Sequence, residues 1–169
     1  MKFKCETAYN QEAITIMAKA IRKTVRKKRS RRSHILGWIV LALSLLLTVS
    51  DFRDGFEISM KNIVTWLAML CILAVLIWED AINGYIAGKR LLKGTEKALT
   101  VFGEEDFLSA NEIGQTKWRY DKILWLAETA EYFVFIFSAS HAQVYAKTGL
   151  TGGTVDEFRK FLEEKTGKP

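Results

Sequence analysis

The chain has 169 residues, of which 49% are hydrophobic, and it carries a formal net charge of +6 with a single proline. This length fits one compact domain with at most a small addition, and the apolar content excludes a disordered chain. Residues 1–33 have a net charge of +9 and the remainder −3, so the basicity belongs to one segment and gives no general argument for nucleic-acid binding.

The first residues predict a short strand followed by a helix. In KFKCETA, Phe3 and Cys5 alternate with polar neighbours, as in a half-buried strand. Asn10 suits the N-cap of a helix that starts at Gln11. The apolar stripe of this helix consists of Ile14, Met17, Ala18, Ile21 and Val25. We expect the helix to continue through residue 33 into the apolar segment that follows.

A strongly basic segment, RKTVRKKRSRRSH, covers residues 22–34. Its eight bases are Arg22, Lys23, Arg26, Lys27, Lys28, Arg29, Arg31 and Arg32. Such a run suits nucleic acid, a nuclear import receptor or anionic lipid. Because only two residues separate Arg32 from the apolar Ile35, the position favours lipid headgroups. We therefore predict an anionic-lipid contact that also sets membrane topology, and no nucleic-acid partner.

Two uncharged apolar runs, Ile35 to Val49 and Asn62 to Trp78, predict transmembrane helices. Each is slightly shorter than the ~20 residues that span a bilayer but reaches the lower limit of ~17 with its flanks. Neither run has the polar face of a soluble helix, and Trp38 and Trp78 lie near run ends, as interfacial anchors do. The first run begins too late for a signal peptide. The short linker between the runs predicts an antiparallel hairpin.

Lysine and arginine in the short flanks predict the orientation of the hairpin. The outer linker offers only Arg53 and Lys61, whereas the basic segment precedes the first run. Four more bases follow the second run, namely Lys89, Arg90, Lys93 and Lys97. We therefore expect a multi-pass protein of the cell membrane with both termini in the cytoplasm.

A second helix is expected to continue the second span on the cytoplasmic side. Its apolar residues Ile82, Tyr85, Ile86 and Leu92 are predicted to pack on the stripe of the first helix, forming a two-helix stalk. Gly84 and Gly88 make a GxxxG pattern outside the apolar run, which indicates close helix packing at most.

From residue 98 the pattern changes to short strands and turns. ALTVF and DFLSAN flank a tight turn at GEE, and TKWRYDKILWLAE reads as one long strand or two strands joined by a bend. ETAE predicts another turn before YFVFIFS, which is apolar on both faces like a central strand, and HAQVYAK predicts the strand after it. TGLTGG predicts a loop. Thr154 and Glu157 have capping-box spacing at the start of a helix with Phe158, Phe161 and Leu162 on one face.

This order of elements resembles the YcxB-like family of bacterial membrane proteins over nearly the whole chain. The likeness is most specific in the strand Trp118-Arg-Tyr-Asp-Lys-Ile123 and continues in YFVF, AQVYAK and the helix FRKFL. The motif positions that it implies are structural: Trp118, Tyr120, Asp121, Ile123 and Lys147. The resemblance implies an α+β membrane protein whose transmembrane helical hairpin is inserted after the first strand of a small antiparallel pleckstrin-homology-like (PH-like) β-barrel, closed by a C-terminal α-helix. It implies no catalytic activity.

The expected division of the chain follows from these elements. It comprises an N-terminal strand at 1–9, an amphipathic and basic helix at 10–33, spans at 34–50 and 62–78 with an external loop at 51–61 between them, a cytoplasmic stalk helix at 79–97, and a β-domain with its C-terminal helix at 98–169.

The residues that carry chemistry form no recognisable site. No catalytic triad, metalloprotease motif or nucleotide-binding loop occurs. The run Glu104-Glu105-Asp106 sits in a predicted turn, and His34 opens the first span as an interfacial residue. His141 begins a strand, and Cys5 and Cys71 lie far apart without a zinc-ligand spacing, which predicts reduced thiols. We expect no enzyme, no metal and no cofactor.

Two classes of function fit these expectations. The first is a non-enzymatic, membrane-anchored interaction module that presents a PH-like domain at the inner leaflet to protein, peptide or lipid partners. Residues 98–169 hold 8 basic and 11 acidic residues, which favours protein or peptide partners over headgroups for this domain. The second class is a small membrane immunity or stress factor, or an accessory subunit of a transporter.

Overall fold

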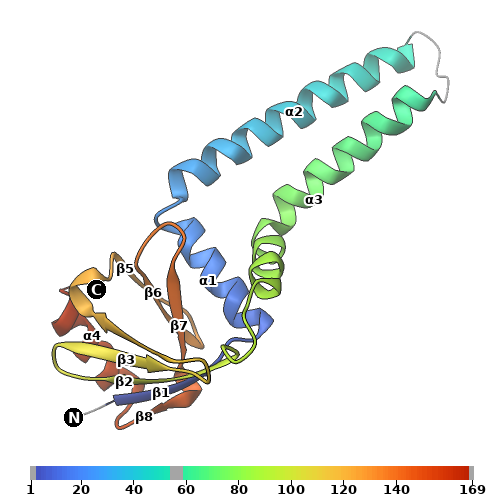
Figure 1. Ribbon diagram of the computed structural model, residues 1–169. Coiled ribbons are helices and arrows are strands. Elements are labelled where there is room, and N and C mark those ends of the chain that lie inside the picture. The colour runs from blue at the N-terminus through green and yellow to red at the C-terminus, as the bar shows by residue number, and fades with distance from the viewer. Residues whose placement is uncertain (1–2, 54–58, 168–169) are drawn as a thin grey trace.

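The computed structural model describes residues 3–53 and 59–167. A β-domain forms one end of the molecule, and a long helical hairpin projects from it (Figure 1). The hairpin consists of α2 (Lys27–Arg53) and α3 (Met60–Lys89). Both helices are long and apolar enough to cross a membrane, as predicted. The external loop expected at 51–61 lies partly outside the described residues.

The hairpin is an insertion between two neighbouring strands. Strand β1 (Phe3–Ala8) pairs antiparallel with β2 (Lys97–Phe102), with Phe3 opposite Phe102. The prediction that the N-terminal strand joins the sheet formed after residue 98 is therefore confirmed. Both ends of the hairpin consequently enter the same β-domain.

The β-domain contains two antiparallel sheets. The first has the order β4-β3-β2-β1-β8 and adds β3 (Asp106–Ala110), β4 (Gln115–Arg119) and β8 (Leu150–Thr151). The second has the order β5-β6-β7, with β5 (Trp125–Glu128), β6 (Tyr132–Ile136) and β7 (Ala142–Ala146).

Two expectations for this region are resolved by the pairing of strands. The segment TKWRYDKILWLAE forms two strands, because a 3₁₀ turn over Tyr120–Lys122 separates β4 from β5. The TGLTGG segment was expected to be a loop, which is wrong for its middle. Lys4 and Cys5 of β1 pair with Thr151 and Leu150 there. Residues with little local preference for a strand therefore form one because a strand distant in the sequence pairs with them.

The main core lies between the two sheets and α4 (Val155–Thr166). Alternate residues of β6, Phe133 and Phe135, point into this core, and α4 adds Phe158 and Leu162. The predicted capping box is present: Thr154 Oγ1 accepts from the Glu157 N–H while the Glu157 carboxylate accepts from the Thr154 N–H at 2.7 Å. The cap begins α4 where its apolar face meets the sheets.

Helix α1 (Gln11–Lys23) covers the other face of the second sheet. Ala13, Ala20 and Ile21 pack there with Val134 and Ile136 of β6. Asn10 caps the helix as predicted, accepting from the Ala13 N–H at 2.8 Å. Because α1 covers one face of β6 and the main core covers the other, every residue of β6 is buried.

The packing predicted between α1 and α3 is wrong in its contacts. Ile82, Tyr85 and Ile86 are exposed, by 36%, 55% and 44%. The stalk helix, predicted to extend to residue 97, ends at Lys89, so Leu92 lies outside it. The two helices instead meet through the small residues of α3, since a Cβ added at Gly84 would lie 2.8 Å from the Thr15 Cα. Glycine permits a closer approach than larger side chains allow, so α3 lies directly against α1 at Gly84, as the predicted two-helix stalk requires.

The helices also break where continuity was expected. Thr24 leaves the helical conformation at φ −107° and ψ −92°, so α1 and α2 are separate helices. Trp78 interrupts α3 with φ −106° and ψ 22°. Neither break contains proline or glycine.

Side chains connect the two sheets beside β1 and β7. The Cys5 Sγ lies 3.2 Å from the Ala146 carbonyl oxygen, and the Ala146 N–H donates to Thr7 Oγ1 at 3.1 Å. Within the described residues the strands pair as two sheets, without a ladder of backbone hydrogen bonds between β1 and β7.

Candidate functional site

Seven exposed bases surround the junction between α1 and α2. We call them the basic collar, and they are Lys23, Arg26, Lys27, Lys28, Arg29, Arg31 and Arg32. No member forms an ion pair with another residue that the structure describes. Their charges are therefore available to an external anion. The remaining base of the predicted set, Arg22, differs from these seven because it forms ion pairs within the protein.

Arg22 is held by a carboxylate of α3. Its Nε and Nη2 donate to the two oxygens of Asp80 at 2.5 and 2.7 Å. Hydrogen bonding to Asp80 raises the pKa of the Arg22 guanidinium. A bidentate pair of this kind fixes both position and orientation of the two side chains. Arg22 is therefore engaged within the protein, unlike its neighbours in the sequence.

Glu79 gathers three further groups beside this pair. Its Oε2 lies 2.6 Å from His34 Nε2, accepts from Ser30 Oγ at 3.2 Å and lies 3.5 Å from Arg22 Nη1. We call Arg22, Ser30, His34, Glu79 and Asp80 the junction cluster. It joins α1, α2 and α3 immediately beside both helix breaks.

The junction cluster is not predicted by the sequence. The position of His34 predicts an interfacial residue, and no pattern predicts a partner for Glu79 or Asp80. One signal was available: in an antiparallel hairpin, the two acids that follow the second apolar run lie opposite the histidine that precedes the first run.

The residues of the proposed family motif do not share a site. Tyr120 and Ile123 are buried, and the Tyr120 hydroxyl donates to the Gly103 carbonyl at 2.9 Å. Burial raises the pKa of the Tyr120 phenol. Asp121 is exposed and pairs with Arg119 at 3.1 Å. These positions stabilise the bend between β4 and β5.

Trp118 belongs to an aromatic cluster at the tip of the β6–β7 hairpin. Its ring stacks on His141 with centroids 5.0 Å apart and lies 4.6 Å from Phe137. Burial lowers the pKa of His141, which favours its neutral form. The Trp118 indole N–H is buried and has no partner among the described residues. The cluster joins β4 of the first sheet to the second.

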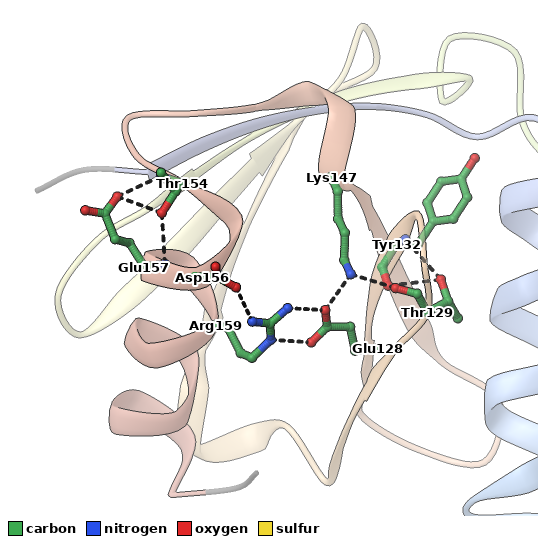
Figure 2. Close-up of polar contacts among 8 residues, drawn as sticks. All are labelled: Glu128, Thr129, Tyr132, Lys147, Thr154, Asp156, Glu157 and Arg159. Carbon is green, nitrogen blue, oxygen red and sulfur yellow. Dashed lines mark hydrogen bonds and ion pairs between the residues drawn. The ribbon is translucent and has the colours of Figure 1, made fainter.

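Lys147 takes part in a network that ties α4 to the second sheet (Figure 2). The Glu128 carboxylate receives Arg159 Nε and Nη2 at 2.8 and 2.7 Å and also pairs with Lys147. Arg159 pairs with Asp156 one turn earlier in α4. Hydrogen bonds from Arg159, then those from Lys147, lower the pKa of Glu128 to about 2. The network is structural, and each charge in it has an opposite charge.

A polar depression of about 680 Å³ lies beside β3 and β4. It is lined by Glu104, Glu105, Asp106, Lys117, Arg119, Tyr120, Asp121 and Lys165. Lys117 pairs with Asp106 at 2.7 Å, and Arg119 pairs with Asp121. Because the lining carries four acids and three bases, two of which pair with acids, the depression has no strong field of one sign that would select an ion.

Comparisons with protein-family models, with curated proteins and with solved structures find no match to this chain.

Proposed function

We propose that this chain is a YcxB-like membrane protein whose hairpin crosses the bacterial cell membrane twice and presents its β-domain to a peptide or protein partner at the inner leaflet. The observation that carries the proposal is the insertion of the hairpin between the paired strands β1 and β2. None of the residues in the most apolar stretch of either helix is buried, unlike those of a soluble core helix. Two long helices with exposed apolar side chains are stable in the hydrocarbon core of a bilayer.

The distribution of bases supports an orientation with both termini in the cytoplasm. The basic collar adjoins α2, and Lys89, Arg90, Lys93 and Lys97 follow α3 on the same side of the hairpin. The collar gains roughly 1 kcal/mol for each charge near anionic lipid. Headgroups therefore occupy the collar and leave the β-domain for another partner.

The architecture of the β-domain supports a PH-like assignment of its fold. Two antiparallel sheets enclose an aromatic core, and a C-terminal helix covers one side of that core. Its excess of acidic residues favours a protein or peptide over a phosphoinositide headgroup. A non-enzymatic adaptor requires no cofactor.

Two measurements test the proposal. The first is labelling of Ser59→Cys in a Cys71→Ala background with a membrane-impermeant maleimide added to intact cells. Labelling supports the orientation, and its absence, with labelling restored after permeabilisation, rejects it. A matched cysteine at Glu112, in the β-domain, should show the reverse pattern.

The second measurement is crosslinking in native membranes followed by purification. A partner that is crosslinked through the β-domain in repeated experiments supports the adaptor. If the purified chain carries only lipid, the proposed partner class is wrong even when the topology is correct.

A further inference from the structure

The two helical connections between the hairpin and the β-domain both contain a break in the helix, and the two breaks lie close to the same side-chain cluster. Thr24 ends α1 just before α2 starts at Lys27, and Trp78 interrupts α3. Beyond these breaks the hairpin stands clear of the sheets (Figure 1). Two helix breaks side by side form the usual geometry of a hinge, because a few residues absorb the change in backbone direction.

The junction cluster crosses this hinge. Arg22 extends from the last turn of α1, Ser30 and His34 lie one helical turn apart on α2, and Glu79 and Asp80 follow the break in α3. Two adjacent carboxylates thus hold groups from the segments on both sides of the α1–α2 break.

The side chains of the junction cluster are partly shielded from water, so their ion pairs are stronger than those of exposed surface groups. The side chains of Arg22, Glu79 and Asp80 are only 22–24% exposed, and that of His34 is 30% exposed. Removing one member of such a group leaves its partner partly desolvated without a counter-charge. An exposed surface pair, such as Arg119 with Asp121, has no comparable effect.

We propose that the junction cluster is a lock on a joint between the hairpin and the β-domain, and that it sets the orientation of the β-domain relative to the membrane. This inference rests on the proposed function in one respect, since it takes the hairpin as the membrane anchor. When the lock is intact, the β-domain is held at one angle. When Glu79 loses Ser30 and His34, the members of the cluster on the hairpin side of the breaks, the β-domain pivots on the two helix breaks.

The test measures distances between nitroxide labels across the joint. Met60, at the far end of α3, is 75% exposed, and Glu112 is exposed in the β3–β4 turn. The full chain with Met60→Cys, Glu112→Cys and Cys71→Ala is labelled and inserted into nanodiscs of anionic and neutral lipid. Cys5 stays in place, because its thiol is buried. Double electron–electron resonance then gives the distribution of label distances.

We expect a narrow distribution for the parent chain and a broader or shifted one for Glu79→Gln with Asp80→Asn. Asp121→Asn, which removes a surface pair, should keep the parent distribution. The single variant Asp80→Asn, which leaves the contacts of Glu79 with Ser30 and His34 in place, should keep the narrow distribution, which a general loss of folding would not do. An unchanged distribution in the inserted Glu79→Gln, Asp80→Asn chain overturns the lock. Failure of the parent chain to enter nanodiscs would instead reject the membrane anchor.

Discussion

At the scale of single residues, Glu128 shows how one side chain holds two elements together. It is the last residue of β5, and it binds Arg159 of α4 and Lys147 directly after β7 (Figure 2). These cations lower its pKa from 4.5 to about 2. A depressed pKa means that the folded state holds the ionised carboxylate more strongly than the unfolded state does.

The contribution of Glu128 to stability should therefore depend on pH in one direction. It is present in full above about pH 4.5 and is lost as the pH falls toward about 2. Urea unfolding of the full chain in detergent, followed by tryptophan fluorescence, should give a lower midpoint for Glu128→Gln at neutral pH. The difference from the parent chain should shrink in acid. Glu104→Gln, in an exposed turn, should show no difference; a Glu128→Gln effect independent of pH would contradict the assignment.

At the scale of elements, the approach of α3 to α1 depends on two glycines with different surroundings. A Cβ at Gly84 would meet the Thr15 backbone at 2.8 Å, whereas the tightest contact of one at Gly88 would be with the end of the Gln11 side chain, at 2.9 Å. Backbone cannot move aside without shifting a helix, but the end of a flexible side chain can. The two positions therefore differ in how much volume they tolerate.

We expect Gly84→Ala to destabilise the chain by about 2 kcal/mol through overpacking. Gly88→Ala should be close to neutral, because Gln11 can move and alanine gains up to about 1 kcal/mol of helix propensity. Gly114→Ala, with nothing within 4 Å of the added Cβ, is the matched control. Thermal unfolding in detergent, followed by near-ultraviolet circular dichroism, measures all three. Equal effects at Gly84 and Gly88 would reject close backbone contact.

The elements that the sequence predicts correctly are those with local causes. The Asn10 cap, the Thr154–Glu157 capping box and the buried strand β6 each follow from residues a few positions apart. The breaks at Thr24 and Trp78 have no local cause of this kind, because the side chains of the junction cluster beside them come from α1, α2 and α3. The junction cluster likewise joins Arg22 to Asp80 across 58 positions, so no local pattern contains it.

At the scale of the whole molecule, the hairpin separates two strands that must meet. β1 is complete after eight residues, yet its partner β2 begins only at Lys97. Pairing over such a sequence separation is intrinsically slow, because the long loop must close before the strands can meet. If α2 and α3 span the bilayer, the β-domain can assemble only when the chain has crossed the membrane an even number of times.

Removal of one span should therefore prevent the β-domain from folding. If both helices span the bilayer, deleting residues 62–78 leaves β1 on one side of the membrane and carries β2 to β8 to the other, so β1 cannot complete the first sheet. In its absence β2 and β8 lose their shared neighbour, and the main core loses Phe3 and Cys5. We expect trypsin to degrade residues 98–169 of this variant in opened membranes and to spare them in the parent chain. Replacing residues 62–78 with a leucine–alanine segment of equal length restores two crossings and should restore protection. A protected β-domain in the single-span variant would show that β1 and β2 still share a compartment, and that the apolar helices do not cross the membrane.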